Sequence, residues 1–210
     1  MPNQAMLTRR AALSAILSLF APARAGSVSL PASLPTEPWA AKLITAAEAQ
    51  VGVTLSYDPA YRKLSFPGGD VPRAAGVCTD VVIRAYRDAL GADLQQLVNA
   101  DMKRIFAAYP KIWGLSRTDT NIDHRRVLNL KVFFKRKGAE KPVSAAGADY
   151  LPGDLVTQML PGNLPHIAII SNQLNADQSR PLVIHNIGGG AQIEDTLFAY
   201  EITGRYRYPA

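Results

Sequence analysis

Cysteine and histidine are scarce in this sequence of 210 residues, which contains one cysteine and three histidines. A single cysteine excludes an internal disulfide, so any thiol chemistry depends on Cys78 alone. Common zinc motifs place two Cys or His ligands a few residues apart, whereas Cys78, His166 and His185 are far apart in the sequence. We therefore predict neither a metal site nor a cofactor.

Charge is also sparse, at 19% of residues, and beyond residue 25 no apolar run is long enough to span a bilayer. The whole chain carries a net charge of +6. Removal of residues 1–25 takes away three arginines and no acidic residue, which leaves 23 − 3 = 20 basic and 17 acidic residues, or +3. So mild a charge argues against a nucleic-acid partner. The lack of a second apolar run of spanning length predicts a soluble mature protein.

The first 25 residues have the pattern of a secretory signal peptide. Thr8-Arg9-Arg10 precedes an apolar run from Ala11 to Ala21, and Ala23-Arg24-Ala25 offers small residues two positions apart. At about 1.5 Å per residue the run covers only about half of a bilayer core, which argues against a membrane span. The paired arginines leave twin-arginine and general export equally open. We expect cleavage near Ala25 and export to the periplasm or the cell exterior.

Composition divides the remaining chain into a linker, residues 26–38, and a single domain, residues 39–210. Helical spacing of apolar residues predicts helices over 39–51, 78–90 with Gly91 as the stop, 93–109, and 120–138. Thr120 and Asp123 have the spacing of a capping box at the start of the last of these helices. Short Val- and Ile-rich runs predict strands over 154–160, 166–171 and 182–187, with one or two more in 192–208 and a bulge near Gly204. Helices followed by strands predict an α+β fold in which helices pack on an antiparallel sheet.

Cys78 lies at the predicted start of a helix, where free N–H groups and the helix dipole favour a thiolate. A nucleophilic thiol also needs a base. His166 opens a predicted strand, and His185 or Asn186 lies late in the next one, so His166 can act as the base while one of the other two orients its ring. Which of them faces the cleft depends on the strand register.

Several other residues carry two interpretations. Asp80 either caps the helix or binds a substrate amine, and capping is the more common role. Tyr57 and Trp113 either line a cleft or pack in the core. The segment Asp123-His124-Arg125-Arg126 either binds a carboxylate or phosphate or forms a solvated helix face, and the solvated face is the more common role. There the arginines would lower the pKa of an exposed His124.

The order of these features resembles the NlpC-type cysteine amidases, papain-like enzymes that cut the peptides of bacterial peptidoglycan. The resemblance is carried by Cys78 at a helix start, the segment 152–156, the strand opened by His166, and Ile184-His185. It implies a papain-like fold with a triad of Cys78, His166 and His185. The amidases have Asp-Cys-Ser-Gly at the nucleophile, whereas this chain has Val77-Cys78-Thr79-Asp80, so the acid that holds a substrate amine in some amidases is displaced.

The sequence is also similar to a bacterial domain family of unknown function, DUF1287, over residues 51–208. The likeness is carried by residues 76–86, 113–115, 121–129 and 185–188. Together these features lead us to expect an exported thiol amidase or endopeptidase acting on peptidoglycan or other envelope peptides. The alternatives are a catalytically silent peptide-binding module and, because the cysteine precedes the histidine here, less favourably a thiol acyltransferase acting on lipids.

Overall fold

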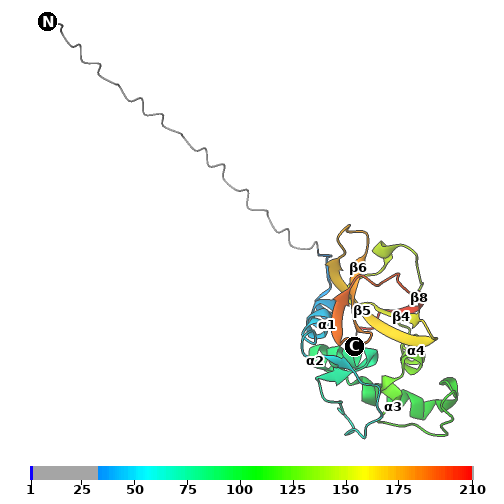
Figure 1. The fold of residues 1–210 in the computed structure, drawn as a ribbon. Coiled ribbons are helices and arrows are strands. Elements are labelled where there is room, and N and C mark those ends of the chain that lie inside the picture. The colour runs from blue at the N-terminus through cyan, green and yellow to red at the C-terminus, as the bar shows by residue number, and fades with distance from the viewer. Residues whose placement is uncertain (2–32, 210) are drawn as a thin grey trace. The chain divides into compact units, whose positions relative to one another are not determined.

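Four α-helices are present in the part of the chain that the computed structural model describes, residues 33–209 together with Met1 (Figure 1). The helices are α1 (Pro38–Glu48), α2 (Cys78–Leu90), α3 (Leu94–Arg104) and α4 (Val127–Arg136). Three short 3-10 helices are η1 (Phe106–Ala108), η2 (Asp123–Arg125) and η3 (Gly147–Asp149). The predicted signal peptide and most of the predicted linker lie outside the described residues.

A six-stranded sheet follows the helices, so the predicted α+β fold with an antiparallel sheet is confirmed. Its strands are β3 (Glu140–Lys141), β4 (Leu155–Leu160), β5 (Leu164–Leu174), β6 (Pro181–Asn186), β7 (Ala191–Glu194) and β8 (Glu201–Tyr206). They lie in the order β3-β8-β4-β5-β6-β7, and every pair is antiparallel. Before α2, the short strands β1 (Ser56–Tyr57) and β2 (Ala75–Gly76) form a separate parallel pair.

Apolar residues pack on both faces of the sheet because side chains alternate along each strand. On one face, Ile167 and Ile169 of β5 join the main core formed with the helices, which includes Cys78. On the other face, Ala168 and Ile170 pack in a second cluster with β4, β6 and the segment after β7. The central helix α2 is buried on all sides over its first nine residues, 78–86.

The helix α2 has the boundaries that the sequence predicts. It begins at Cys78, and its C-cap Gly91 adopts the left-handed conformation, φ 66°, that favours glycine. The bulge expected near Gly204 is present: Thr157 pairs with Gly204 and Gln158 with Ile202, which leaves Thr203 as the extra residue.

Three predicted helices are shorter than expected. The predicted helix 39–51 ends at Glu48. The predicted helix 93–109 ends at Arg104 and continues as η1, and the predicted helix 120–138 starts only at Val127. Thr120 does not cap a helix, because the Asp123 carboxylate accepts the N–H of Asp119 instead, at 2.6 Å. Among the described residues, none of the helices combines the length and the apolarity needed to cross a membrane.

Candidate active site

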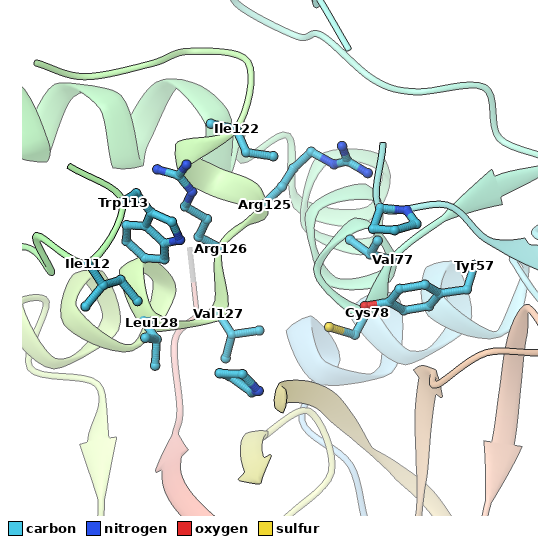
Figure 2. A pocket seen from close by; sticks show the side chains of 12 residues that line it. Tyr57, Val77, Cys78, Ile112, Trp113, Ile122, Arg125, Arg126, Val127 and Leu128 are labelled. Atoms are coloured by element: carbon cyan, nitrogen blue, oxygen red, sulfur yellow. The ribbon is translucent and has the colours of Figure 1, made fainter. Parts of the chain in front are cut away.

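Cys78 occupies the first turn of α2 and its side chain is buried, with 3% exposure. It lies at the wall of a pocket of about 260 Å³ (Figure 2). The pocket is lined by Tyr57, Pro59, Val77, Cys78, Ile112, Trp113, Ile122, Arg125, Arg126, Val127, Leu128 and Pro165. A thiol at a helix start and beside a pocket is the arrangement that a nucleophile requires.

Burial raises the pKa of the Cys78 thiol to about 11. The backbone of Ile167 contacts the thiol and acts in the opposite direction, while the nearby charge of Asp80 adds to the increase. Weaker lowering effects come from the backbone of Thr79 and the hydroxyl of Tyr57. Desolvation is the largest of these effects, so Cys78 is a neutral thiol in this conformation at neutral pH.

His166 and His185 lie on neighbouring strands and are hydrogen-bonded to each other. Nε2 of His166 lies 2.9 Å from Nδ1 of His185, and Nε2 of His185 lies 2.7 Å from a carboxylate oxygen of Glu194. The three side chains form a continuous chain across β5, β6 and β7. Sequence reasoning missed Glu194, because its position diagonal to His185 depends on the pairing of β6 with β7.

The carboxylate of Glu194 determines which nitrogens of this chain carry protons. An ionised carboxylate only accepts hydrogen bonds, so Nε2 of His185 must be the donor. Nδ1 of a neutral His185 is then an acceptor, and Nε2 of His166 donates to it. This assignment leaves the lone pair of a neutral His166 on Nδ1, the nitrogen that a general base would use.

Both imidazoles are neutral in the folded protein. Burial, followed by the charge of the nearby His185, lowers the pKa of His166 to about 3. Burial also lowers the pKa of His185, although Glu194 opposes that change. A histidine with so low a pKa does not form a stable ion pair with a thiol whose pKa is about 11.

Cys78 and His166 reach the start of β5 from different sides. Ile167 packs with Cys78, and the alternation of side chains places the His166 ring on the other face, with Ala168 and Ile170. The β5–β6 ladder begins with Ile169 paired to Ile184, so Ile167 lies beyond it and its backbone contacts the thiol. Within residues 33–209 no hydrogen bond joins Cys78 to either histidine, so the structure assembles the histidine pair and leaves the predicted triad incomplete.

Asn186 does not orient the ring of His166, which was one of the two alternatives that the sequence left open. Its side-chain amide donates to the carbonyl oxygens of Gly76, at 3.0 Å, and Ser56, at 3.2 Å. His185 is therefore the residue that bonds His166, whereas Asn186 faces the opposite side of β6. There it holds β1 and β2, the segments that precede Cys78.

Asp80 is fully engaged within the protein. Its carboxylate accepts the backbone N–H of Val77 at 2.7 Å and forms a bidentate pair with Arg125, with both distances 2.9 Å. The side chains of the pair are 4% and 2% exposed. These bonds match the capping interpretation, and they leave no oxygen of Asp80 free for a substrate amine.

The expected exposure of His124 and Arg125 is wrong. His124 is 2% exposed, and burial, followed by the charge of Arg125, lowers its pKa to about 4. The direction of the pKa shift was predicted, but the surface position was not. The reason is long-range: Arg125 turns inward to pair with Asp80, and η2 packs against α3.

Tyr57 and Trp113 both line the pocket. Figure 2 places Cys78 and Tyr57 on one side of it and Trp113 with Arg126 on the other. The guanidinium of Arg126 lies over the Trp113 ring, 4.1 Å from its centre. Across the described part of the chain, no group of three or more His, Cys, Asp or Glu side chains has an arrangement that could hold a metal ion.

Comparison with known proteins gives the family. Residues 44–208 match the family model described as Domain of unknown function (DUF1287). The chain is also 52% identical over 162 residues to the uncharacterized protein YijF of Escherichia coli strain K12, a match that covers 77% of this chain and 78% of that protein. The chain therefore belongs to the DUF1287 family.

Proposed function

We propose that the protein is a thiol hydrolase, an amidase or endopeptidase that cleaves amide bonds in peptides of the bacterial cell envelope. The observation that carries the proposal is the chain from Glu194 through His185 to His166. It aligns one imidazole as a base, next to the β5 segment whose backbone contacts the Cys78 thiol. A nucleophile, a base and a group that orients the base are the parts that covalent catalysis requires.

The reaction follows from these parts. The sulfur of Cys78 attacks the amide carbonyl while its proton passes to Nδ1 of His166, and backbone N–H groups at the start of α2 stabilise the oxyanion. The C–N bond then breaks as the proton moves to the leaving nitrogen. Water attacks the resulting thioester, which releases a carboxylic acid and restores the thiol.

In this proposal the thiol reaches His166 where β5 and β6 are not yet paired. The β5–β6 ladder begins only at Ile169, and the sulfur already contacts the backbone of Ile167. Because sulfur and the His166 ring lie on opposite faces of β5, rotation of the Cys78 side chain alone does not join them. In this proposal substrate binding also shifts the start of β5, which pairs with β4 but not with β6, so that sulfur and Nδ1 meet. The neutral thiol and the neutral imidazole are the resting state of this pair.

The papain-like, NlpC-type fold belongs to the same proposal. It is supported by the order of the elements: a helix begins at the cysteine and is followed by an antiparallel sheet with the two histidines on adjacent strands. The peptidoglycan substrate and export by the signal-like residues 1–25 are parts of the proposal that rest on the sequence.

A second candidate is a peptide-binding module without catalysis. It is favoured by the raised thiol pKa and by the lack of a hydrogen bond between Cys78 and His166 in the described residues. The two candidates differ in one respect, which is whether peptide bonds are broken.

The test is to incubate the purified protein with peptides released from peptidoglycan and to detect new amino and carboxyl termini by mass spectrometry. We expect cleavage by the wild type, none by Cys78→Ala, and a rate lowered roughly 100-fold or more by His166→Gln. Arg180→Gln, which removes an exposed pair with Asp195, is the matched control and should cleave normally. A wild-type protein that binds the peptides and leaves them intact would instead support the binding module.

A further inference from the structure

Two consecutive arginines line the pocket and differ in how well their charges are compensated. Arg125 is paired in a bidentate manner with Asp80, and its guanidinium also donates to two backbone carbonyl groups, of Asp58 and Ala60. Its side chain is 2% exposed. Arg125 is therefore a structural residue with little capacity for a ligand.

Arg126 is held less completely. One guanidinium nitrogen, Nη1, lies 3.3 Å from Asp123, which is longer than the ~2.7–2.9 Å of a strong charge-assisted bond. The other oxygen of Asp123 accepts the backbone N–H of Asp119. The side chain of Arg126 is 17% exposed, so part of its guanidinium reaches solvent.

Trp113 contacts the Arg126 guanidinium in a cation–π interaction. The guanidinium carbon lies over the Trp113 ring, 4.1 Å from its centre, and Figure 2 shows the two side chains next to each other. Stacking on an aromatic ring holds a guanidinium plane in place and leaves its edge free to bind a planar anion with two parallel hydrogen bonds. Arg126 is in this way prepared for a carboxylate.

The rest of the pocket suits the same kind of ligand. No acidic residue lines it, and apart from the two arginines its wall is built from the thiol, Tyr57, Trp113 and aliphatic or proline side chains. Its volume of about 260 Å³ lies just below the ~300–1,000 Å³ of pockets that enclose a whole small-molecule ligand. The pocket therefore accommodates a short part of a peptide between Cys78 and Arg126.

We propose that Arg126, stacked on Trp113, binds a free carboxylate on the substrate residue next to the scissile amide. This inference rests on the proposed function, because it takes Cys78 as the point at which the amide is held. It assigns the substrate class as peptides with an anionic residue at the cleavage position. Recognition by Arg126 takes the place of amine recognition by Asp80, whose oxygens are both occupied.

The experiment measures binding without requiring cleavage. The chain has two tryptophans, so Trp39→Phe leaves Trp113 as the only indole reporter, and Cys78→Ala prevents turnover. This double variant is titrated with two short peptides that differ only in Glu or Gln at the position tested. We expect the Glu peptide to quench Trp113 fluorescence with an affinity about tenfold higher or more, the ratio typical of one hydrogen bond to a charged group.

Added variants assign the effect to Arg126. Arg126→Gln should remove the preference for Glu, and Arg126→Lys should retain part of it, because a lysine keeps the charge but loses the planar geometry. Arg117 lines a different pocket. Arg117→Gln is therefore the control: it removes the same charge and should leave the preference for Glu intact. Equal affinity for the two peptides, no binding of either, or a preference that survives Arg126→Gln would each overturn the inference.

The outcomes also separate this inference from the proposed function. If the wild type cleaves the Glu and Gln peptides at equal rates, the hydrolase proposal stands and the role of Arg126 is wrong. If the preference for Glu is present but the wild type cleaves neither peptide nor any peptidoglycan fragment, Arg126 binds carboxylates in a protein that is not a hydrolase.

Discussion

The hydrogen-bonded series His166–His185–Glu194 shows how a single carboxylate can determine the tautomer of a histidine two hydrogen bonds away. Glu194 accepts from His185, which in turn accepts from His166. Because the carboxylate cannot donate, the proton positions on both rings follow from it. Nδ1 of His166 therefore keeps its lone pair, and any base chemistry depends on a residue that would not touch the substrate.

Replacement of Glu194 by glutamine tests this dependence. The glutamate raises the pKa of His185 against the effect of burial, so Glu194→Gln should lower that pKa further. Gln can also donate, which removes the constraint on the tautomers. Nitrogen chemical shifts of the histidine rings in NMR spectra should then show both tautomers of His185 where the wild type shows one.

The consequence for the proposed hydrolysis is specific. We expect Glu194→Gln to lower kcat by roughly tenfold to a hundredfold with little change in KM, because the variant alters a group that orients the base and leaves the pocket intact. Exposed Glu201→Gln is the control. An unchanged His185 spectrum in Glu194→Gln would show that the carboxylate does not set the tautomers.

At the scale of elements, the start of α2 is held by contacts from three directions. Asp80 closes the first turn, Arg125 of η2 pairs with Asp80, and Asn186 of β6 holds the carbonyl of Gly76. The position of Cys78 is thus fixed by α2, by the segment before α4, and by the sheet. A change in any of them is expected to alter the thiol as well as the stability.

The buried pair of Asp80 and Arg125 gives a stability prediction. Arg125→Met leaves the Asp80 carboxylate buried without its partner and should lower the free energy of unfolding by about 3–5 kcal/mol. Arg62→Met is the control: Arg62 approaches Asp58 to 2.6 Å, closer than the buried pair, but its side chain is 47% exposed. Arg62→Met should lower the free energy of unfolding by about 1 kcal/mol or less. Urea unfolding of both variants checks the prediction, and equal losses would contradict it.

Local patterns in the sequence predict the elements well where neighbours in the chain decide the structure. The spacing of Cys78, Val82 and Ala85, with Gly91 at the end, predicts α2 because helical periodicity is a local property. The strands follow from Val- and Ile-rich runs in the same way. The start of α4 was misplaced because Asp123 bonds the backbone of Asp119 rather than capping a helix.

Residues of the site were harder to predict, because their neighbours come from distant parts of the chain. The pairing of His166 with His185 follows once their strands are adjacent, but Glu194 joins them only through the register of β7. The polar neighbours of His124 predict an exposed position. In the structure His124 is buried, in the 3-10 helix η2 whose Arg125 pairs with Asp80. Side-chain alternation along β5 predicts that His166 and Ile167 point to opposite faces of the sheet. Which of these faces Cys78 packs against is determined by the packing of α2, which the local sequence does not show.

For the whole molecule, the three histidines share one property: each has a lowered pKa because burial disfavours its charged form. The values are about 4 for His124 and about 3 for His166. In the unfolded chain they titrate near 6.5, so between pH 6.5 and 4 the unfolded state binds protons that the folded state does not. Stability is therefore lost as the pH falls through this range.

We predict a loss of about 2 kcal/mol between pH 7 and pH 5 for each histidine that stays neutral in the folded state. Against a typical total stability of ~5–15 kcal/mol, the losses expected for His124 and His166, whose pKa values lie below 5, are a large fraction. Urea unfolding at pH 7, 6 and 5 measures this loss of stability. In His124→Gln the loss between pH 7 and pH 5 should be smaller by the contribution of one histidine. A free energy of unfolding that does not change over this range would mean that the histidines are charged in the folded protein.

The long reach of the bonds around Cys78 has a consequence for the order in which the site is assembled. The cysteine comes early in the chain, but the amide that holds Gly76 belongs to a residue 110 positions later, and the partner of Asp80 lies 45 positions later. A growing or truncated chain that ends before β5 contains the thiol without Asn186 or either histidine of the pair. The thiol is thus present long before the histidine pair proposed as its base, and a chain cut short before β5 cannot carry out the proposed hydrolysis.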